Sequence, residues 1–482
     1  MCLLVSCGHI ASATQPFWKQ TLPNSMFSSV GIIGSATSSD DNISGIKFAA
    51  ATWMNGPELV EVFSSESKNG TVNWVYQQHD ISESTLAVAA ARHIDLPSSG
   101  PVDLVVAKQY QAQGFGACVL LGFSSKNSTA NPRWKYNIVG NCSVDLTLEG
   151  DSKPTLKLSD DGSTVVFAVV TFDARTETNT PQLHCVDGQS GGSIFVFQPE
   201  NTSVGTNSVS LSRGGKYIAY SNGLTVYVLE RSGQLRSTPL LRQMESDVHI
   251  CPMGVFLLYA VNDGSVVRSW NASSKEYQIT PFQPKTPAGT PNTWIAVSHA
   301  TSVNGEGSNP TGCIAAVGWL GMGPNQGIAK LEVFSMLTGQ VFVSWTSKRG
   351  NGLENFPVMA MHFGYTALGL WGNTARSIQP NILLFHINSG NTPVIEYSST
   401  GSIMAIDLVY TPYALPPLKG PGQLTKNNQA KVFVIAAGKI EHATMVGKGG
   451  RCLAFSVPVA EGAPPTVAAS GVDLFKGLPL KS

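Results

Sequence analysis

Three of the nine histidines stand at the ends of similar short apolar segments: His93 in LAVAAARH, His299 in WIAVSH and His362 in VMAMH. Asp407 in IMAIDLVY and Asp161 in LKLSDDG occupy comparable places. Neutral imidazoles that converge with a carboxylate can bind a divalent metal ion or act as general base and acid. Alternatively, each of these side chains satisfies backbone groups at the end of a buried strand. We favour the second interpretation, predict no cofactor, and keep a divalent metal as a hypothesis.

Catalytic and phosphate-binding motifs give little support for an enzyme. The sequence contains no H-E-x-x-H helix and no G-x-x-x-x-G-K-[ST] loop, which are the patterns of zinc proteases and of P-loops. GFGACVLLG and GNGLEN carry glycines, but no helix is expected after them, so they do not form phosphate cradles. The sequence leaves enzymatic activity open and favours a protein that is not an enzyme.

Composition excludes several classes of protein. The 482 residues include 31 Lys+Arg and 31 Asp+Glu, only 13% charged residues, and 42% hydrophobic residues, which is unlike a disordered or coiled-coil chain. No run of basic residues occurs, which argues against a nucleic-acid or anionic-membrane partner. No apolar stretch reaches the ~18 residues that a membrane span requires. We therefore predict no nucleic-acid partner and no membrane span.

The N-terminal segment and the glycosylation motifs indicate secretion. MCLLVSCGHIASATQ combines a short apolar stretch with Ala11-Ser12-Ala13, a small-x-small pattern that precedes signal cleavage. We interpret residues 1–13 as the remnant of a signal peptide; an ordinary unstructured N-terminus is the alternative. Asn-x-Ser/Thr acceptors for N-glycans occur at Asn42, Asn69, Asn127, Asn141, Asn201 and Asn271. The expected location is extracellular.

A repeated hairpin covers the chain. In KLEVFSMLTGQVFVSW at 330–345 and LVEVFSSESKNGTVNWVYQ at 59–77, alternating strands flank a turn that contains glycine, which is the pattern of a hairpin with one buried face. Two more short apolar strands precede each copy. We count eight first strands, which start near Ser29, Leu86, Pro154, Ser208, Asp247, Asn292, Pro357 and Ile403.

Units of four strands and about 40 to 65 residues are typical of propeller blades. We therefore predict an all-β protein in which residues 14–456 form a single β-propeller of eight four-stranded blades, with seven as the alternative. Residues 457–482, rich in Ala, Pro and Gly, form a C-terminal tail. The segment PFWKQTLP at 16–23 resembles the outer strands but has no blade of its own. We expect it to pair with the last unit and close the ring, so that no long edge is exposed.

FSMLTGQVFVSW and NGTVNWVY resemble the repeats of pyrroloquinoline-quinone-type eight-bladed propellers. The resemblance implies that Gly70 with Trp74, and Gly339 with Trp345, are turn and blade-docking residues. The fourth unit has no aromatic residue in its outer strand. The quinone enzymes of that family carry a disulfide between adjacent cysteines, and this chain has no Cys-Cys dipeptide. We therefore take from this resemblance only the expected propeller fold and not the quinone-dependent activity.

The cysteines divide into one predicted pair and four others. Cys118 and Cys142 flank a turn centred on Ala130, so in an antiparallel hairpin they would face each other, and we predict a disulfide between them. The other four lie in strands of different units, and we predict buried free thiols. These are Cys185, Cys251, Cys313 and Cys452.

The favoured function is a secreted binding or scaffold protein for a glycan or an extracellular protein. Tryptophans on loops could stack on sugar rings, and the long Gly- and Pro-rich insertions at 301–312, 320–328 and 414–429 are suited to binding. One alternative is an extracellular hydrolase or lyase that uses the histidines and Asp407. Another is a purely structural wall or matrix protein. The oligomeric state and the binding face are left open.

Overall fold

The structure is a computed structural model. It describes residues 15–16, 18–22, 26–33, 47–53, 59–64, 72–77, 83–91, 101–112, 115–124, 129–142, 155–173, 178–200, 208–241, 247–261, 264–284, 294–302, 313–321, 328–347, 358–370, 379–411, 431–440 and 449–458. These residues form β-strands with one short 3₁₀ helix, Arg213–Gly215. They include no helix that is long and apolar enough to cross a membrane.

The strands follow one another in groups of four, and within each group neighbours in sequence pair antiparallel. Group 1 consists of β2 (Met26–Ile33), β3 (Lys47–Trp53), β4 (Leu59–Ser64) and β5 (Val72–Gln77), and group 2 of β6 (Glu83–Ala90), β7 (Leu104–Ala112), β8 (Phe115–Phe123) and β9 (Trp134–Cys142). Group 3 consists of β10 (Thr155–Leu158), β11 (Thr164–Asp173), β12 (Thr178–Asp187) and β13 (Ser193–Phe197), and group 4 of β14 (Ser208–Leu211), β15 (Tyr217–Ser221), β16 (Thr225–Glu230) and β17 (Leu240–Leu241).

The second half of the chain repeats this arrangement. Group 5 consists of β18 (Val248–Ile250), β19 (Phe256–Val261), β20 (Gly264–Asn271) and β21 (Glu276–Ile279), and group 6 of β22 (Trp294–Ser302), β23 (Cys313–Gly321), β24 (Ala329–Ser335) and β25 (Val341–Thr346). Group 7 consists of β26 (Val358–His362), β27 (Tyr365–Gly369), β28 (Ile382–His386) and β29 (Ile395–Tyr397), and group 8 of β30 (Ser402–Thr411), β31 (Lys431–Lys439) and β32 (Gly450–Pro458) with β1 (Trp18–Leu22). Groups 2 and 3 form one continuous sheet because Cys142 and Asn141 of β9 pair with Thr171 and Phe172 of β11.

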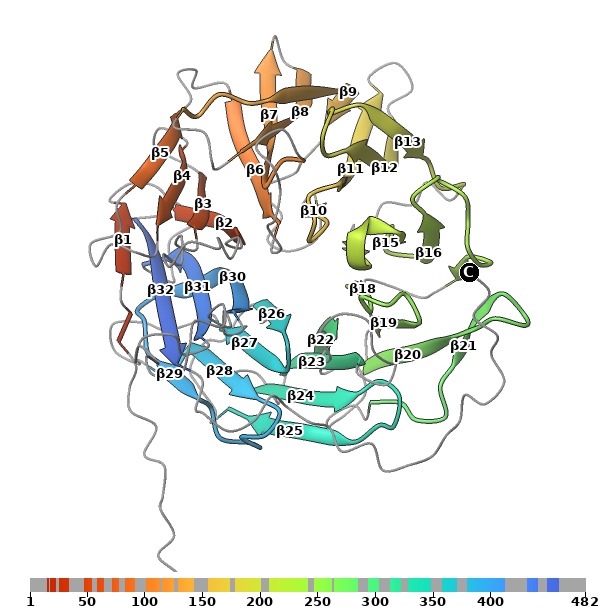
Figure 1. Ribbon diagram of the computed structural model, residues 1–482, viewed down its shortest axis with the longest axis vertical. Helices are drawn as coiled ribbons and strands as arrows, with labels where there is room; N and C mark the ends of the chain where they lie inside the picture. Colours follow the sequence, from red (N-terminus) through yellow and green to blue (C-terminus); the bar gives the residue numbers. More distant parts are fainter. Residues whose placement is uncertain are drawn as a thin grey trace, which may run out of the picture.

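The groups are arranged in a ring, with the first strand of each group innermost (Figure 1). Each first strand contacts the first strand of the next group, and β30 contacts β2. A circular array of four-stranded antiparallel sheets whose first strands face a common axis defines one architecture. The chain is a β-propeller.

The hydrophobic core is divided among the interfaces between groups. The described residues contain eight clusters of buried apolar side chains, and each cluster combines residues of two successive groups. In the cluster that joins the ends of the chain, Phe27 and Ile32 of group 1 pack with Val409 and Ile435 of group 8. Middle strands therefore have two apolar faces, as in β23, which is buried at every position. In the outer strand β25, by contrast, only Val343 is buried, and Val341, Ser344 and Thr346 are exposed.

Most sequence predictions about the strands are confirmed. All eight predicted first strands are present, within three residues of the expected starts. The N-terminal segment forms β1, which pairs antiparallel with β32 from Trp18 opposite Ala454 to Leu22 opposite Gly450. β32 continues to Pro458, two residues beyond the expected end of the domain. The tail from residue 459 lies outside the described residues.

Candidate functional site

Polar side chains on first strands accept hydrogen bonds from the backbone of the next first strand. Ser29 Oγ accepts from Val88 N at 3.1 Å, which joins group 1 to group 2. In group 4, Ser208 Oγ accepts from Val248 N at 3.1 Å and Ser210 Oγ from Ile250 N at 3.2 Å. The same direction of bonding recurs around the ring, so these hydroxyl groups hold neighbouring groups together.

His362 and Asp407, two of the predicted channel residues, belong to this pattern. His362 Nδ1 accepts a hydrogen bond of 2.9 Å from Tyr410 N in group 8. Asp407 Oδ2 accepts from Ile32 N in group 1 at 2.9 Å, and its Oδ1 accepts from Leu408 N at 2.9 Å. Both side chains therefore accept hydrogen bonds from backbone N–H groups of the next group, which is the structural role that the sequence analysis favoured.

Substituting Asp407 by asparagine is expected to lower the free energy of unfolding by about 1–2 kcal/mol. An amide keeps one acceptor oxygen, so one of the two backbone N–H groups then faces an NH₂ group. Urea unfolding measures the change. The matched control is Glu396→Gln at the exposed middle position of the outer strand β29, which should be neutral. Equal stability of both variants would show that the Asp407 contacts contribute nothing.

Asp161 stabilises its own turn. Its Oδ1 accepts from Ser159 Oγ at 2.6 Å, from Ser163 Oγ at 2.8 Å and from Ser163 N at 3.0 Å. Burial by itself would raise the pKa of Asp161, but these hydrogen bonds outweigh it and hold the pKa below its ordinary value. The adjacent Asp160 accepts from Gly214 N at 2.9 Å, in the next group.

The convergence of the three predicted histidines stays a prediction, because only His362 has a described side chain. His93 lies outside the described residues, and for His299 only the backbone in β22 is described, opposite Ala316. In the described part of the chain, no three His, Cys, Asp or Glu side chains gather in a way that could hold a metal ion.

A second polar cluster lies where groups 4 and 5 meet, and the sequence analysis missed it. Ser208 Oγ donates to Asp247 Oδ1 at 2.6 Å, and Asp247 Oδ2 lies 3.2 Å from His249 Nε2. Desolvation opposes ionisation of Asp247, but His249 and Ser208 lower its pKa below the ordinary value. The carboxylate lies between the hydroxyl and the imidazole, whereas activation of a serine requires the imidazole in the middle. This order stabilises a carboxylate and does not activate Ser208.

The segment GQSGG at 188–192 has the G-x-S-x-G spacing of a nucleophile elbow. Such an elbow joins a strand to a helix, whereas this segment is the turn between antiparallel strands β12 and β13. Ser190 Oγ donates to Asp187 Oδ1 at 2.8 Å. The serine therefore closes a hairpin turn.

His184 is a buried histidine that couples groups 2 and 3. Its Nδ1 lies 3.1 Å from the Tyr136 hydroxyl of β9, and its Nε2 lies 3.1 Å from Gln182 Oε1. The amide oxygen can only accept, so Nε2 carries the proton and Nδ1 accepts from Tyr136. Burial lowers the pKa of His184 to about 4.

The buried neutral imidazole predicts that acid weakens the fold. Because the pKa of His184 is about 4 in the folded chain and 6.5 when unperturbed, its contribution is complete above pH 6.5 and is lost as the pH falls toward 4. The free energy of unfolding should fall by about 2 kcal/mol from pH 7 to pH 5 through this group. Urea unfolding of wild type and His184→Gln at both pH values measures it. An equal pH dependence in the variant would contradict the assignment.

The turn between first and second strands repeats in groups 3, 4 and 5. It spans Ser159–Thr164, Ser212–Tyr217 and Cys251–Phe256, and in each the N–H of the first residue donates to the carbonyl of the last at 2.9 Å. The sequence signal is serine or cysteine followed three positions later by glycine, as in SDDG, SRGG and CPMG. Cys251 thus occupies a position that serine holds in the two preceding groups.

The expectation that Cys251 and Cys313 are free thiols is wrong. They form a disulfide between groups 5 and 6, with Cα atoms 6.2 Å apart. The prediction failed because their proximity arises from packing between sheets and not within a hairpin. Cys185 is a buried free thiol, as expected, and Cys452 is buried.

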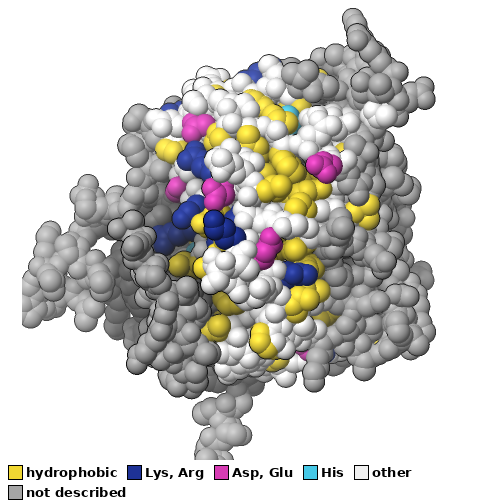
Figure 2. All heavy atoms as spheres, turned by 90° about the vertical axis from the view of Figure 1, so that its right-hand side faces the viewer, with side chains coloured by type: hydrophobic (Ala, Val, Ile, Leu, Met, Phe, Trp, Pro, Cys, Tyr) yellow, Lys and Arg dark blue, Asp and Glu magenta, His cyan; other side chains and the backbone are white. Residues whose placement is uncertain are grey.

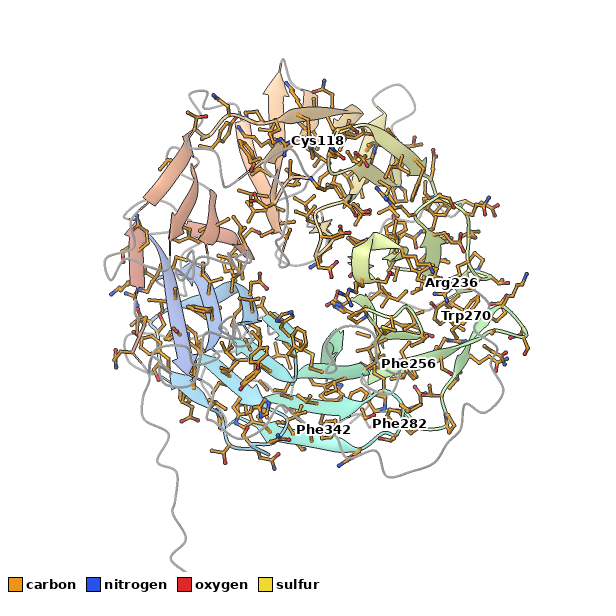
Figure 3. All side chains as sticks on the ribbon, viewed as in Figure 1. Cys118, Arg236, Phe256, Trp270, Phe282 and Phe342 are labelled. Atoms are coloured by element: carbon orange, nitrogen blue, oxygen red, sulfur yellow. A yellow bond between two sulfur atoms is a disulfide. The ribbon has the colours of Figure 1, made fainter. Side chains whose placement is uncertain are left out.

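Cys118 (labelled in Figure 3) is disulfide-bonded. In the β8–β9 ladder Cys118 lies opposite Ile138, and Ala117 lies opposite Asn141, with a bulge between the two pairs. Cys142 is therefore not its direct cross-strand neighbour, and the Cys142 side chain lies outside the described residues. The pairing of Cys118 with Cys142 stays a prediction.

Glycines in turns between third and fourth strands pack under rings of the preceding group. Gly339, at φ +73°, lies so close to Phe282 (labelled in Figure 3) that an added Cβ would stand 2.5 Å from the ring. Trp345 packs on the other side of its group, 5.7 Å from Phe385 of β28. Gly339 and Trp345 thus serve different interfaces. Gly70 and the side chain of Trp74 lie outside the described residues.

Arg236 occupies the interface of group 4, whose outer strand has no aromatic residue. Its guanidinium carbon lies 3.6 Å from the ring centre of Tyr217 and 4.0 Å from that of Trp270 in group 5 (Figure 3). Nη1 also donates to Gly254 O at 2.7 Å and to the Tyr277 hydroxyl at 2.8 Å. Cation–π and hydrogen-bond contacts therefore replace the usual aromatic docking residue.

Asn271 is the one glycosylation candidate whose side chain the structure describes. It begins the β20–β21 turn, is partly exposed, and its Oδ1 accepts from Ser273 N at 2.9 Å. Asn141 lies in β9, with its side chain outside the described residues. The remaining acceptors, Asn42, Asn69, Asn127 and Asn201, lie outside the described residues.

Comparisons with known proteins give only limited similarity. No family model matches the sequence, and no curated protein matches it. Among solved structures, the Dos1 propeller resembles this chain with a TM-score of 0.40 and 11% sequence identity, over 74% of this chain and 92% of that one. No activity or ligand follows from a similarity at this level.

Proposed function

We propose that this protein is an extracellular, closed eight-bladed β-propeller of the quinoprotein-like type that serves as a rigid binding scaffold for a glycan or an extracellular protein. Each four-strand group would be one blade. The pairing of β1 with β32, the contact of β30 with β2, and the core cluster shared by groups 8 and 1 support a closed ring of eight.

The disulfides support the extracellular location. Cys251–Cys313 joins two groups, and Cys118 is also disulfide-bonded. Structural disulfides persist in oxidising compartments and are rare in the cytosol. N-glycosylation at Asn271 and the other acceptors is part of the same proposal.

The polar side chains on the first strands support binding over catalysis. Ser29, His362 and Asp407 each accept a backbone hydrogen bond from the next group. These side chains stiffen the ring, and a rigid ring with variable loops is a scaffold for recognition. On the side of the ring shown in Figure 2, basic and acidic side chains are interspersed among small hydrophobic areas. Recognition would then depend on shape and stacking more than on net charge.

The test uses the full chain, secreted from eukaryotic cells with its disulfides intact, on a glycan array and in a hydrolysis assay with and without added divalent metal. Saturable binding to one class of glycan without turnover supports the proposal. Metal-dependent turnover would favour a hydrolase or lyase. Recovery only in an insoluble matrix, with neither binding nor turnover, would favour a structural protein.

A further inference from the structure

Phe363 has a positive φ, a backbone conformation for which the described turns of groups 3, 4 and 5 use glycine. In groups 3, 4 and 5, the turns between first and second strands place Gly162, Gly215 and Gly254 at φ of +66° to +72°. The corresponding turn of group 7 consists of Phe363 at φ +46° and Gly364 at φ +78°. A bulky side chain is strained in this region. Strain of this kind persists where the side chain has a use that the fold alone does not require.

The ring of Phe363 lies in a cluster of aromatic side chains between groups 7 and 8. His362 stands edge-on to it at 4.5 Å, and Tyr410 of β30 lies 5.6 Å away. Below them, Tyr365 stacks on Tyr410 at 6.0 Å and lies 4.4 Å from His386. Phe363, His362 and Tyr410 are each only partly buried. The turn that carries Phe363 leads out of β26, one of the innermost strands of the ring (Figure 1).

The chemistry of this cluster selects an uncharged ligand with a flat apolar face. None of its members is Lys, Arg, Asp or Glu, and burial lowers the pKa of His386, so that this imidazole is neutral at pH 7. The C–H face of a pyranose ring packs on an aromatic ring through apolar contacts that need no charge. A charged sugar would find no counter-ion among these side chains.

We propose that Phe363, flanked by His362 and Tyr410, is the stacking surface for a neutral pyranose ring. This inference rests on the proposed glycan-binding function and names its site and the class of sugar.

The experiment measures the affinity of the full, disulfide-bonded protein for the neutral glycan that gives the strongest array signal, by calorimetry. Phe363→Gly removes the ring at a backbone position that suits glycine, and affinity should fall by about tenfold. Phe363→Leu should cause a similar loss, because it keeps an apolar side chain without a π-face. Phe363→Tyr should stay within about twofold of wild type.

Lys275→Gly is the matched control. Lys275, at φ +55°, is the other non-glycine residue with positive φ in the described part of the chain, and it lies in the exposed β20–β21 turn. Relief of strain there should leave glycan affinity unchanged. If Phe363→Gly does not fold, the affinities of Phe363→Leu and Phe363→Tyr test the site: weaker binding by the leucine variant than by the tyrosine variant supports it, and equal binding overturns it.

The outcomes separate this inference from the proposed function. Glycan binding by wild type that Phe363→Gly and Phe363→Leu retain within about twofold would overturn the site and leave the function standing. A preference for acidic over neutral glycans would overturn the assigned class of sugar. Absence of any glycan binding by wild type would remove the glycan-binding function itself.

Discussion

Replacing Cys251 and Cys313 together by alanine is expected to lower the free energy of unfolding by about 4 kcal/mol. The disulfide joins residues 62 positions apart, and a loop of this length restricts the unfolded chain strongly. Both cysteines are almost completely buried, at 0% and 1% exposure, so the loss of two sulfur atoms from the core adds to the effect. Denaturant unfolding under non-reducing conditions measures the change.

The control for this double substitution is Cys185→Ala, which removes a buried thiol that forms no disulfide. Its cost should be that of a small cavity, about 1 kcal/mol. Alkylation of the denatured protein with and without reductant, followed by peptide mass analysis, checks the pairing directly. Labelling of Cys251 without reductant, or a double variant as stable as wild type, would contradict the assignment.

Substitution of Gly339 by alanine is expected to cost about 3 kcal/mol. Two effects add at this position. A non-glycine residue is disfavoured at φ +73°, and the new Cβ would overlap the Phe282 ring of the preceding group. Relief of the overlap requires Phe282 to move out of its contact with Phe334 in the core between groups 5 and 6.

Gly390→Ala separates the two effects. Gly390 lies in the corresponding turn of group 7 at φ +59°, but no atom stands within 4 Å of the Cβ that a substitution would add. This variant carries the backbone cost alone, about 1 kcal/mol. The difference between the two variants in urea unfolding is therefore the cost of the overlap between the added Cβ and the Phe282 ring. Equal losses at both positions would show that the contact with Phe282 does not matter.

Several local features could be predicted from the sequence because they depend on neighbours along the chain. Alternation around the turn at Gly339 identifies β24 and β25, and the same pattern identifies the hairpins of the other groups. LAVAAARH has the composition of a helix, yet its place in the repeat predicts a strand, and most of it lies in β6. The pairing of β1 with β32 follows from a different argument, the count of outer strands, because the segment at 16–23 has the outer-strand pattern and no unit of its own.

The candidate site was predicted less well. The positions of His362 and Asp407 on first strands follow from the repeat, but their hydrogen-bond partners, Tyr410 N and Ile32 N, belong to other groups. The role of Asp247 could not be predicted because Ser208, which donates to its carboxylate, lies 39 positions away in another group. Phe363 is an ordinary residue in the sequence, and only its φ of +46° marks it.

The sequence by itself determines the strands, their four-strand repeat and the turns, since hydrophobic alternation and glycine positions act over a few residues. The tertiary structure alone decides which groups touch and through which atoms. It places Cys251 beside Cys313 and Arg236 between Tyr217 and Trp270. Such contacts depend on how neighbouring sheets twist and pack, and neither quantity is encoded in the spacing of residues along one strand.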